Sequence, residues 1–111
     1  MAFQNIIGVK LAQAAIGTAY AVVYRVPSNT RTYVKDIDIC NTTGAGITVY
    51  VSLVAVGDTA GTANALYYGY SIAANSVLQW RGVAIMNAAD TIQVKASGAG
   101  CTAYISGGEA T

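Results

Sequence analysis

Apolar and polar residues alternate at every second position through much of the sequence, and this period of two restricts the chain to β-structure. The clearest segment covers residues 47–56, where Ile47, Val49 and Val51 fall on one face and Thr48 and Tyr50 on the other. Further runs of this kind occupy residues 20–26, 31–41, 65–72, 77–80, 83–86, 91–96 and 101–106. We therefore predict about seven or eight short strands and almost no helix.

Turn-forming residues separate these strands at intervals of about 8–12 residues, which is the spacing of a β-sandwich or a small barrel. Pro27 ends the strand at 20–26 and begins a turn. The polar, glycine-containing linker at 41–46 predicts that the strands on either side of it pair as an antiparallel hairpin. Gly82 is expected to separate two short strands, 77–80 and 83–86.

Alternation also predicts which side chains share a face of each strand. In 31–41, Ile37 and Ile39 are expected to point into the core from the same face as Tyr33. In 65–72, Tyr68 and Tyr70 are expected to lie on one face of their strand.

The length of 111 residues predicts a single domain. Residues 18–111 contain the confident strands and form the predicted β-sandwich. Residues 1–17 are apolar but weakly periodic, and two interpretations stay open: an edge strand, or an extended arm that lies on a neighbouring subunit. The arm interpretation predicts that deletion of residues 2–16 leaves a folded domain.

The charge of the chain excludes several classes of partner. Charged residues make up only 10% of the sequence and the net charge is +1, so no long-range field attracts phosphate backbones or anionic lipid. We expect neither nucleic acid nor a membrane as a partner. A chain with so little charge commonly belongs to an assembly in which neighbouring subunits cover apolar surface.

The residue types also argue against catalysis and metal binding. Histidine is absent, which removes the commonest general base and a common metal ligand. Asp36 and Asp38 lack the loop of oxygen ligands that calcium needs and are interpreted as solvated carboxylates that oppose pairing at a sheet edge. We predict that the protein is not an enzyme and binds no cofactor or metal. Cys40 and Cys101 are predicted to be free thiols, since the N-terminal residues show no secretion signal.

Tyrosine is the preferred aromatic residue, with eight tyrosines against one phenylalanine and one tryptophan. Tyr67, Tyr68, Tyr70, Trp80 and Arg81 lie close together in the sequence. Tyrosine buries its ring while its hydroxyl stays hydrogen-bonded, so three interpretations apply: cross-strand pairs within a sheet, a subunit interface, or a carbohydrate-stacking surface.

The run VPSNTRTYVKDIDICNTT at 26–43, with NALY at 64–67, SIAAN at 71–75 and NAADTI at 87–92, resembles small structural proteins of tailed bacteriophages. Among these, a free-standing domain of this length is similar to capsid decoration (head cement) proteins. The resemblance implies an antiparallel, jelly-roll-like β-sandwich that acts as a dimer or trimer and binds the major capsid protein. It also implies synthesis in the host cytoplasm and a final position on the capsid exterior of the virion.

On this hypothesis the contacts are made by apolar N-terminal residues, by tyrosine-rich surface and by arginines at the rim. The candidate interface residues are Phe3, Ile6, Ile7, Leu11, Arg25, Arg31, Tyr67, Tyr68, Tyr70, Trp80 and Arg81.

Two alternative functions stay open. The first is a tail-associated carbohydrate- or host-binding module, in which Tyr67, Tyr70 and Trp80 form a stacking platform near the loop at 57–64. The second is a head-to-tail connector or completion protein, which the sequence does not distinguish from a decoration protein.

Overall fold

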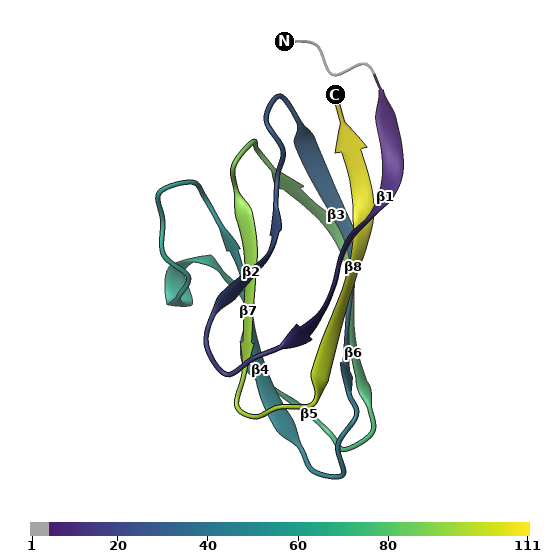
Figure 1. Cartoon of the computed structure of the whole chain (residues 1–111), viewed down its shortest axis with the longest axis vertical. Helices are drawn as coiled ribbons and strands as arrows, with labels where there is room; N and C mark the ends of the chain where they lie inside the picture. Colours follow the sequence, from purple (N-terminus) through teal and green to yellow (C-terminus); the bar gives the residue numbers. More distant parts are fainter. Residues whose placement is uncertain (1–4) are drawn as a thin grey trace.

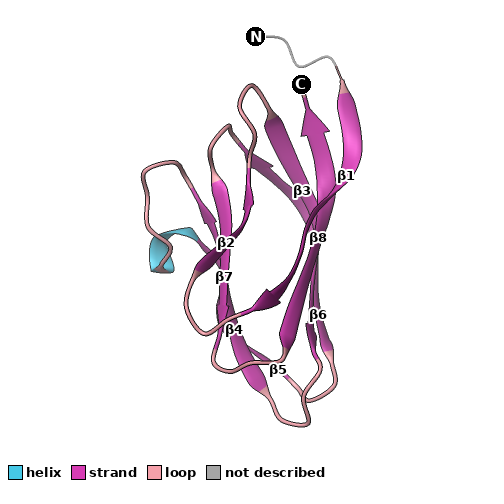
Figure 2. Ribbon diagram, viewed as in Figure 1, coloured by secondary structure: helices cyan, strands magenta, loops and turns pink. Residues whose placement is uncertain are grey.

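The computed structural model describes residues 5–111, and the regular secondary structure of these residues is almost entirely β-strand (Figures 1 and 2). The one helical segment is a single 3-10 turn, η1 (Thr62–Asn64), in the loop before β5. The eight strands are β1 (Ile6–Ile16), β2 (Ala21–Arg25), β3 (Arg31–Asn41), β4 (Ile47–Val54), β5 (Ala65–Ile72), β6 (Val77–Met86), β7 (Thr91–Ala96) and β8 (Cys101–Ala110). The predicted all-β class and strand number are confirmed.

The strands form two four-stranded antiparallel sheets that pack face to face. Sheet A has the order β1-β8-β3-β6 and sheet B the order β2-β7-β4-β5. The chain passes repeatedly between the sheets, as in the eight-stranded jelly roll. In Figure 1 the two sheets stand side by side along the long axis, with the C-terminus beside the start of β1. The predicted antiparallel sandwich is confirmed.

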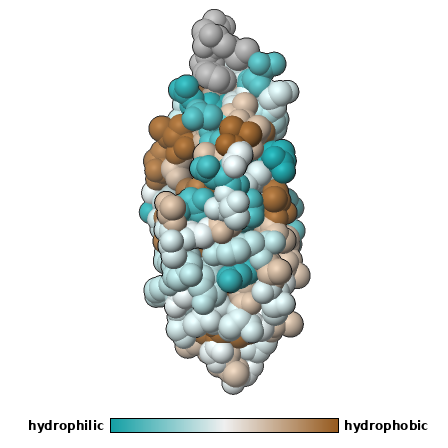
Figure 3. Space-filling view, turned by 90° about the vertical axis from the view of Figure 1, so that its left-hand side faces the viewer, coloured by the Kyte–Doolittle hydropathy of each residue, from teal (hydrophilic) through white to brown (hydrophobic). Residues whose placement is uncertain are grey.

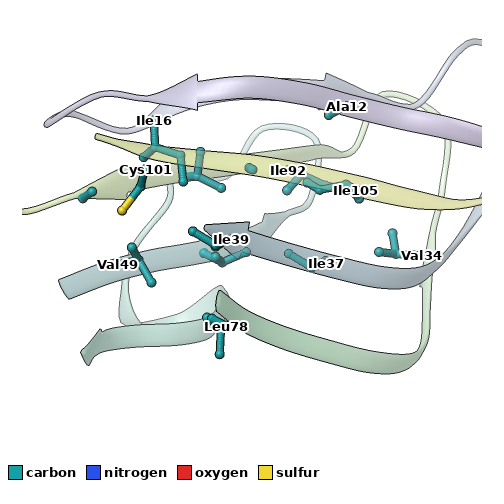
Figure 4. Close-up of a cluster of buried hydrophobic side chains, with 14 of the residues drawn as sticks. Ala12, Ile16, Val34, Ile37, Ile39, Val49, Leu78, Ile92, Cys101 and Ile105 are labelled. Atoms are coloured by element: carbon teal, nitrogen blue, oxygen red, sulfur yellow. The ribbon is translucent and has the colours of Figure 1, made fainter. Parts of the chain in front are cut away.

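The core lies between the sheets and is made of small and branched side chains, with buried members from every strand except β2 (Figure 4). Its fully buried members include Val34, Ile37, Ile39, Val49, Val51, Ile92, Val94, Ala103 and Ile105. These residues come from the segments with the clearest alternation. Burial of these side chains supplies the main driving force for the sandwich.

β1 forms one edge of sheet A and pairs with β8 along its whole length. It contributes Leu11, Ala12 and Ile16 to the core. Within the chain, residues 6–16 therefore complete the sheet to which they belong.

A row of β-bulges crosses sheet A near its middle. The same interval of the sheet contains three residues on β8, four on β1 and on β3, and five on β6. Its ends are the paired residues Gly107 to Ile105, Val9 to Ala12, Val34 to Ile37 and Ala84 to Trp80. The interval therefore contains more residues on the strands on both sides of β8 than on β8 itself. Bulges of this kind bend strands and increase their twist.

The bulge at Lys35 changes which residues of β3 face the core, and the predicted faces are wrong on one side of it. Thr32 and Val34 point into the core before it, and Ile37 and Ile39 after it. Tyr33 therefore does not share the core face with Ile37, because one extra residue shifts the alternation by one position.

A second bulge corrects the predicted faces of β5. Gly69 has a φ of 72°, a conformation that glycine adopts without strain, and the pairing with β4 shifts beside it. Tyr68 pairs with Tyr50, and Tyr70 with the buried Val49. Tyr68 and Tyr70 therefore lie on opposite faces of the strand, and their predicted common face is wrong.

Two predicted connections are also wrong. β6 runs without interruption from Val77 to Met86, and Gly82 lies within it. β3 and β4 do not form a hairpin, because they belong to different sheets. The buried Asn41 side chain turns the chain here: its amide donates to the carbonyls of Ala45 at 2.8 Å and Ile72 at 3.1 Å. These bonds tie the end of β3 to the end of β5 in the opposite sheet.

Candidate interaction surfaces

The structure distributes the predicted interface residues over several parts of the molecule. Phe3 lies outside the described residues. Ile6 and Ile7 are exposed at the start of β1, whereas Leu11 is buried in the core and is not presented to a partner. Arg25 is exposed at the end of β2, and Arg31 is half-buried at the start of β3.

The predicted aromatic cluster is divided between the two sheets and between their inner and outer faces. Tyr67 and Tyr70 touch, with ring centroids 5.2 Å apart and an interplanar angle of 66°. Their pairing partners are buried core residues of β4, so these rings lie at the edge of the core. Trp80 also packs against the core. A sugar-stacking platform needs an exposed flat face, and two rings that cross at this angle do not supply one.

Sheet B carries a row of tyrosines on its outer face, of which only Tyr68 was predicted from the sequence as an interface residue. Tyr50 is edge-on to Tyr68 at 5.0 Å and to Tyr20 at 6.5 Å. Lys95 Nζ lies 4.6 Å from the centroid of the Tyr50 ring and 4.8 Å from that of Tyr20. At these distances the ammonium group makes cation–π contacts with both rings. These contacts hold the lysine side chain between them. We call Tyr20, Tyr50, Tyr68 and Lys95 the tyrosine row.

The tyrosine row has the residue types that dominate binding energy at protein interfaces. Tyr68 is exposed at one end of it. Figure 3 views the molecule from the side of sheet B, and its apolar surface is separated by paler and hydrophilic regions. A partner on this face would therefore meet flat aromatic and polar groups rather than one continuous apolar patch.

The outer face of sheet A holds a shallow groove of about 370 Å³. Ile6, Tyr33, Lys35, Val83 and Gly108 line it. The bulge row explains its shape, because Lys35 and Val83 lie in the bulged interval. The paired residues Gly8 and Gly108 leave the space between Ile6 and Tyr33 without side chains.

A polar band crosses the same face next to the groove. Arg81 approaches Asp36 with an Nη2 to Oδ2 distance of 3.6 Å. Asp38 lies two residues further along β3 on the same face, and burial together with the neighbouring Asp36 carboxylate raises its pKa. Both aspartates lie on a central strand between β8 and β6. The interpretation as solvated carboxylates that protect a sheet edge is therefore wrong.

The two cysteines are free, and sheet geometry explains why. β3 and β8 are neighbours, with Cys101 paired to Asn41 and Cys40 paired to Thr102. Cys101 points into the core, and Cys40 points to the opposite face because adjacent residues of a strand alternate. Burial raises the pKa of the Cys101 thiol, which lowers its reactivity.

Among residues 5–111, no three potential metal ligands come together in a group that could hold an ion. No helix in this described part is long and apolar enough to span a membrane.

No protein-family model matches the sequence, and no curated protein matches it either. Solved structures do show similarity. A chain from Bacillus endospore appendages, which are described as disulfide-linked pili, aligns with a TM-score of 0.62 and 16% identity. The alignment covers 100% of this chain and 94% of that one.

Two further similar chains come from infectious bursal disease virus. The chain of the Gx strain has a TM-score of 0.53 at 10% identity, and that of the T13 viral particle has 0.55 at 9%. Each alignment covers 96% of this chain but only 32% and 30% of the viral chains, so this chain spans about a third of their length. At these identities the similarity shows a shared fold, the eight-stranded sandwich that this chain forms as a single unit.

Proposed function

We propose that the protein is a structural component of a virion: a decoration protein that binds the outer surface of an assembled capsid and stabilises it. The observation that carries this proposal is the tyrosine row, a half-buried aromatic surface on the outer face of sheet B with Tyr68 exposed at one end. The resemblance to phage structural proteins and the fold that the chain shares with particle and pilus proteins agree with such a role. A protein of this kind needs no catalytic group, because it acts by binding one state only.

The energetic basis of decoration is mass action. A protein that binds the assembled lattice, and not its dissociated subunits, lowers the free energy of the assembled state as its concentration exceeds the dissociation constant. The stabilisation depends on the number of occupied sites. A decoration protein therefore binds at many equivalent positions.

We assign the contact with the major capsid protein to the outer face of sheet B. Tyr50 and Tyr68 supply flat, amphipathic contact area with few rotatable bonds, so little conformational entropy is lost when they bind. The Lys95 side chain is already held between two rings. A preorganised surface of this kind contributes more of its contact energy to net affinity.

Co-sedimentation with empty phage shells that lack the protein tests the proposal. We expect saturable binding at hundreds of copies per shell, the order expected for a capsid lattice, and a higher melting temperature of the shells. Binding of only a few copies would instead place the protein at the tail or the connector. Absence of binding would contradict a capsid role.

A matched pair of variants tests the assigned surface in the same assay. Tyr68→Ala removes an exposed ring of the tyrosine row, and we expect it to weaken shell binding by roughly tenfold or more. Tyr70→Ala removes another exposed tyrosine of β5, which lies on the opposite face of that strand, and it serves as the control. Equal binding by both variants would contradict the assignment to sheet B.

A further inference from the structure

We propose that the outer face of sheet A is an interface between two copies of this chain. The proposal concerns the protein on its own and does not require that it binds a capsid. It rests on three properties of this face: its exposed apolar side chains, its balanced charges and its size.

Apolar side chains are exposed on this face at both ends of sheet A. Ile6, Val83 and Ile85 surround the groove and are 66%, 58% and 61% exposed. Val77 and Tyr104 are exposed further along the sheet. These five residues are half of the ten large apolar side chains that are exposed in the described part of the chain. Their concentration on one sheet face favours contact with another protein.

Charges of both signs lie between the apolar ends. One row of paired residues crosses the whole sheet. It runs from Lys10 on β1 through Ser106 on β8 and Asp36 on β3 to Arg81 on β6. Asp38 lies two residues after Asp36 on the same face of β3, and Lys35 lies at the bulge immediately before Asp36. The central strand thus carries negative charge between positive side chains. A second copy of the same face carries both signs and can bring opposite charges together when the two faces are offset, whereas a partner of one sign would repel part of the band.

Two carboxylate oxygens in this band are shielded from solvent but accept no hydrogen bond from residues 5–111. They are Asp36 Oδ1 and Asp38 Oδ1. Shielded acceptors without donors are rare in native proteins because leaving them unpaired is unfavourable. A second copy does not reach atoms that are already shielded, so its contacts with this band fall on the exposed Arg81 and Lys35 side chains beside them.

The size of the face fits a modest dimer. Four strands about 4.8 Å apart and about ten residues long at 3.4 Å per residue form a face of roughly 650 Å². Two such faces bury about 1,300 Å² in total, at the lower end of the range for specific interfaces, about 1,200–2,000 Å². We therefore expect a reversible dimer whose population depends on concentration.

Analytical ultracentrifugation of the purified protein, from micromolar to near-millimolar concentration, tests the proposal. We expect a monomer–dimer equilibrium. Val83→Glu places a charge in the groove, and we expect it to weaken association by roughly tenfold or more. Val22→Glu is the matched control, because Val22 is an exposed valine of sheet B at 47% exposure, and it should leave association unchanged.

The charge pattern allows a second test, in which two opposite charge reversals together restore association between copies. Arg81→Asp and Asp38→Arg should each weaken self-association, and an equimolar mixture of the two should form heterodimers. Circular dichroism and thermal melting identify any variant that does not fold. If a charge variant does not fold, the comparison of Val83→Glu with Val22→Glu tests the interface instead.

Some results would overturn the proposal. A wild-type protein that stays monomeric at every concentration would do so, even if it binds shells, because the occupant of this face would then be another protein. A dimer that tolerates Val83→Glu but is lost in Val22→Glu would place the interface on sheet B.

Discussion

Gly107 is the residue at which the bulge row leaves least space. A Cβ atom built there would lie 2.0 Å from the Tyr33 carbonyl oxygen and 3.2 Å from the Lys35 amide nitrogen. Both neighbours are backbone atoms of the adjacent strand, so a side chain would force β3 and β8 apart. Glycine is therefore required by close approach of two strands and not by a left-handed conformation.

Gly107→Ala should lower the free energy of unfolding by about 1–3 kcal/mol, the usual cost of excess volume in a packed site. Guanidinium denaturation measures the change. Gly8→Ala is the control, because its Cβ would meet only the Gly107 carbonyl oxygen at 3.9 Å. Equal losses in the two variants would contradict the steric explanation.

Tyr24 links the two sheets by hydrogen bonds. From β2 in sheet B, its hydroxyl donates to Glu109 Oε2 at 2.5 Å on β8 and lies 2.7 Å from Thr32 Oγ1 on β3. Burial and the bond to Glu109 raise the pKa of Tyr24 from 10.0 to about 12. The fold therefore favours the protonated phenol.

The raised pKa predicts how stability depends on pH. Between about pH 10 and 12 the unfolded chain ionises at this position while the folded chain keeps its proton, so stability decreases as the pH rises through this range. Tyr24→Phe should lower stability at neutral pH by about 1 kcal/mol through the lost hydrogen bonds. Its stability should also decrease less steeply above pH 10.

Urea denaturation of both proteins from pH 8 to 12 isolates the contribution of Tyr24, because the other tyrosines titrate in both. Parallel curves for wild type and Tyr24→Phe across this range would contradict the prediction.

At the scale of single residues, alternation predicted burial well until a bulge shifted it. Ile37 and Ile39 are core residues as predicted. Tyr33 was predicted on the wrong face of β3, and Tyr68 was wrongly predicted to share a face with Tyr70, because Lys35 and Gly69 each shift the pattern by one position. Glycine at 69 hints at such a bulge, but lysine at 35 does not, since that bulge is imposed by the neighbouring strands.

At the scale of elements, the sequence predicted the strands but not their partners. Local residue types decide whether a segment is extended, whereas pairing depends on contacts between distant segments. The linker at 41–46 illustrates this difference. Its turn-forming residues suit a hairpin, yet the Asn41 side chain bonds to Ile72 and so directs the chain into the other sheet.

Deletion of residues 2–16 tests the role of β1. The arm interpretation predicts a folded remainder, but the structure places Leu11, Ala12 and Ile16 in the core and pairs β1 with β8. We therefore expect the deletion to expose the edge of β8 and to cause unfolding or aggregation. Circular dichroism and size-exclusion chromatography measure the outcome. Deletion of residues 2–4 leaves β1 whole and is the control.

At the scale of the whole molecule, neither surface could be recognised from the sequence alone. The tyrosine row joins residues 20, 50, 68 and 95, which come from separate segments and meet only through the register of sheet B. The groove depends in the same way on bulges that span four strands. The sequence predicted that aromatic and apolar groups serve an interface, and the fold determines which of them share a face.

The two proposals assign different partners to opposite faces, and this separation predicts how variants behave on shells. Val83→Glu should give a monomer that still binds shells through the tyrosine row. In a dimer joined through sheet A the two tyrosine rows face in opposite directions, so only one of them can contact a shell, and the monomer should half-saturate the shells at a similar protein concentration. The number of copies bound at saturation should decrease by up to about half, because a bound copy no longer carries a second one.

Tyr68→Ala should show the opposite behaviour, with weak shell binding and an unchanged dimer. Co-sedimentation titrations and ultracentrifugation of both variants measure the two properties independently. If one variant loses both properties while remaining folded, a single face serves both partners. The sandwich would then use one sheet for assembly, and the separation of functions between the two sheets would be wrong.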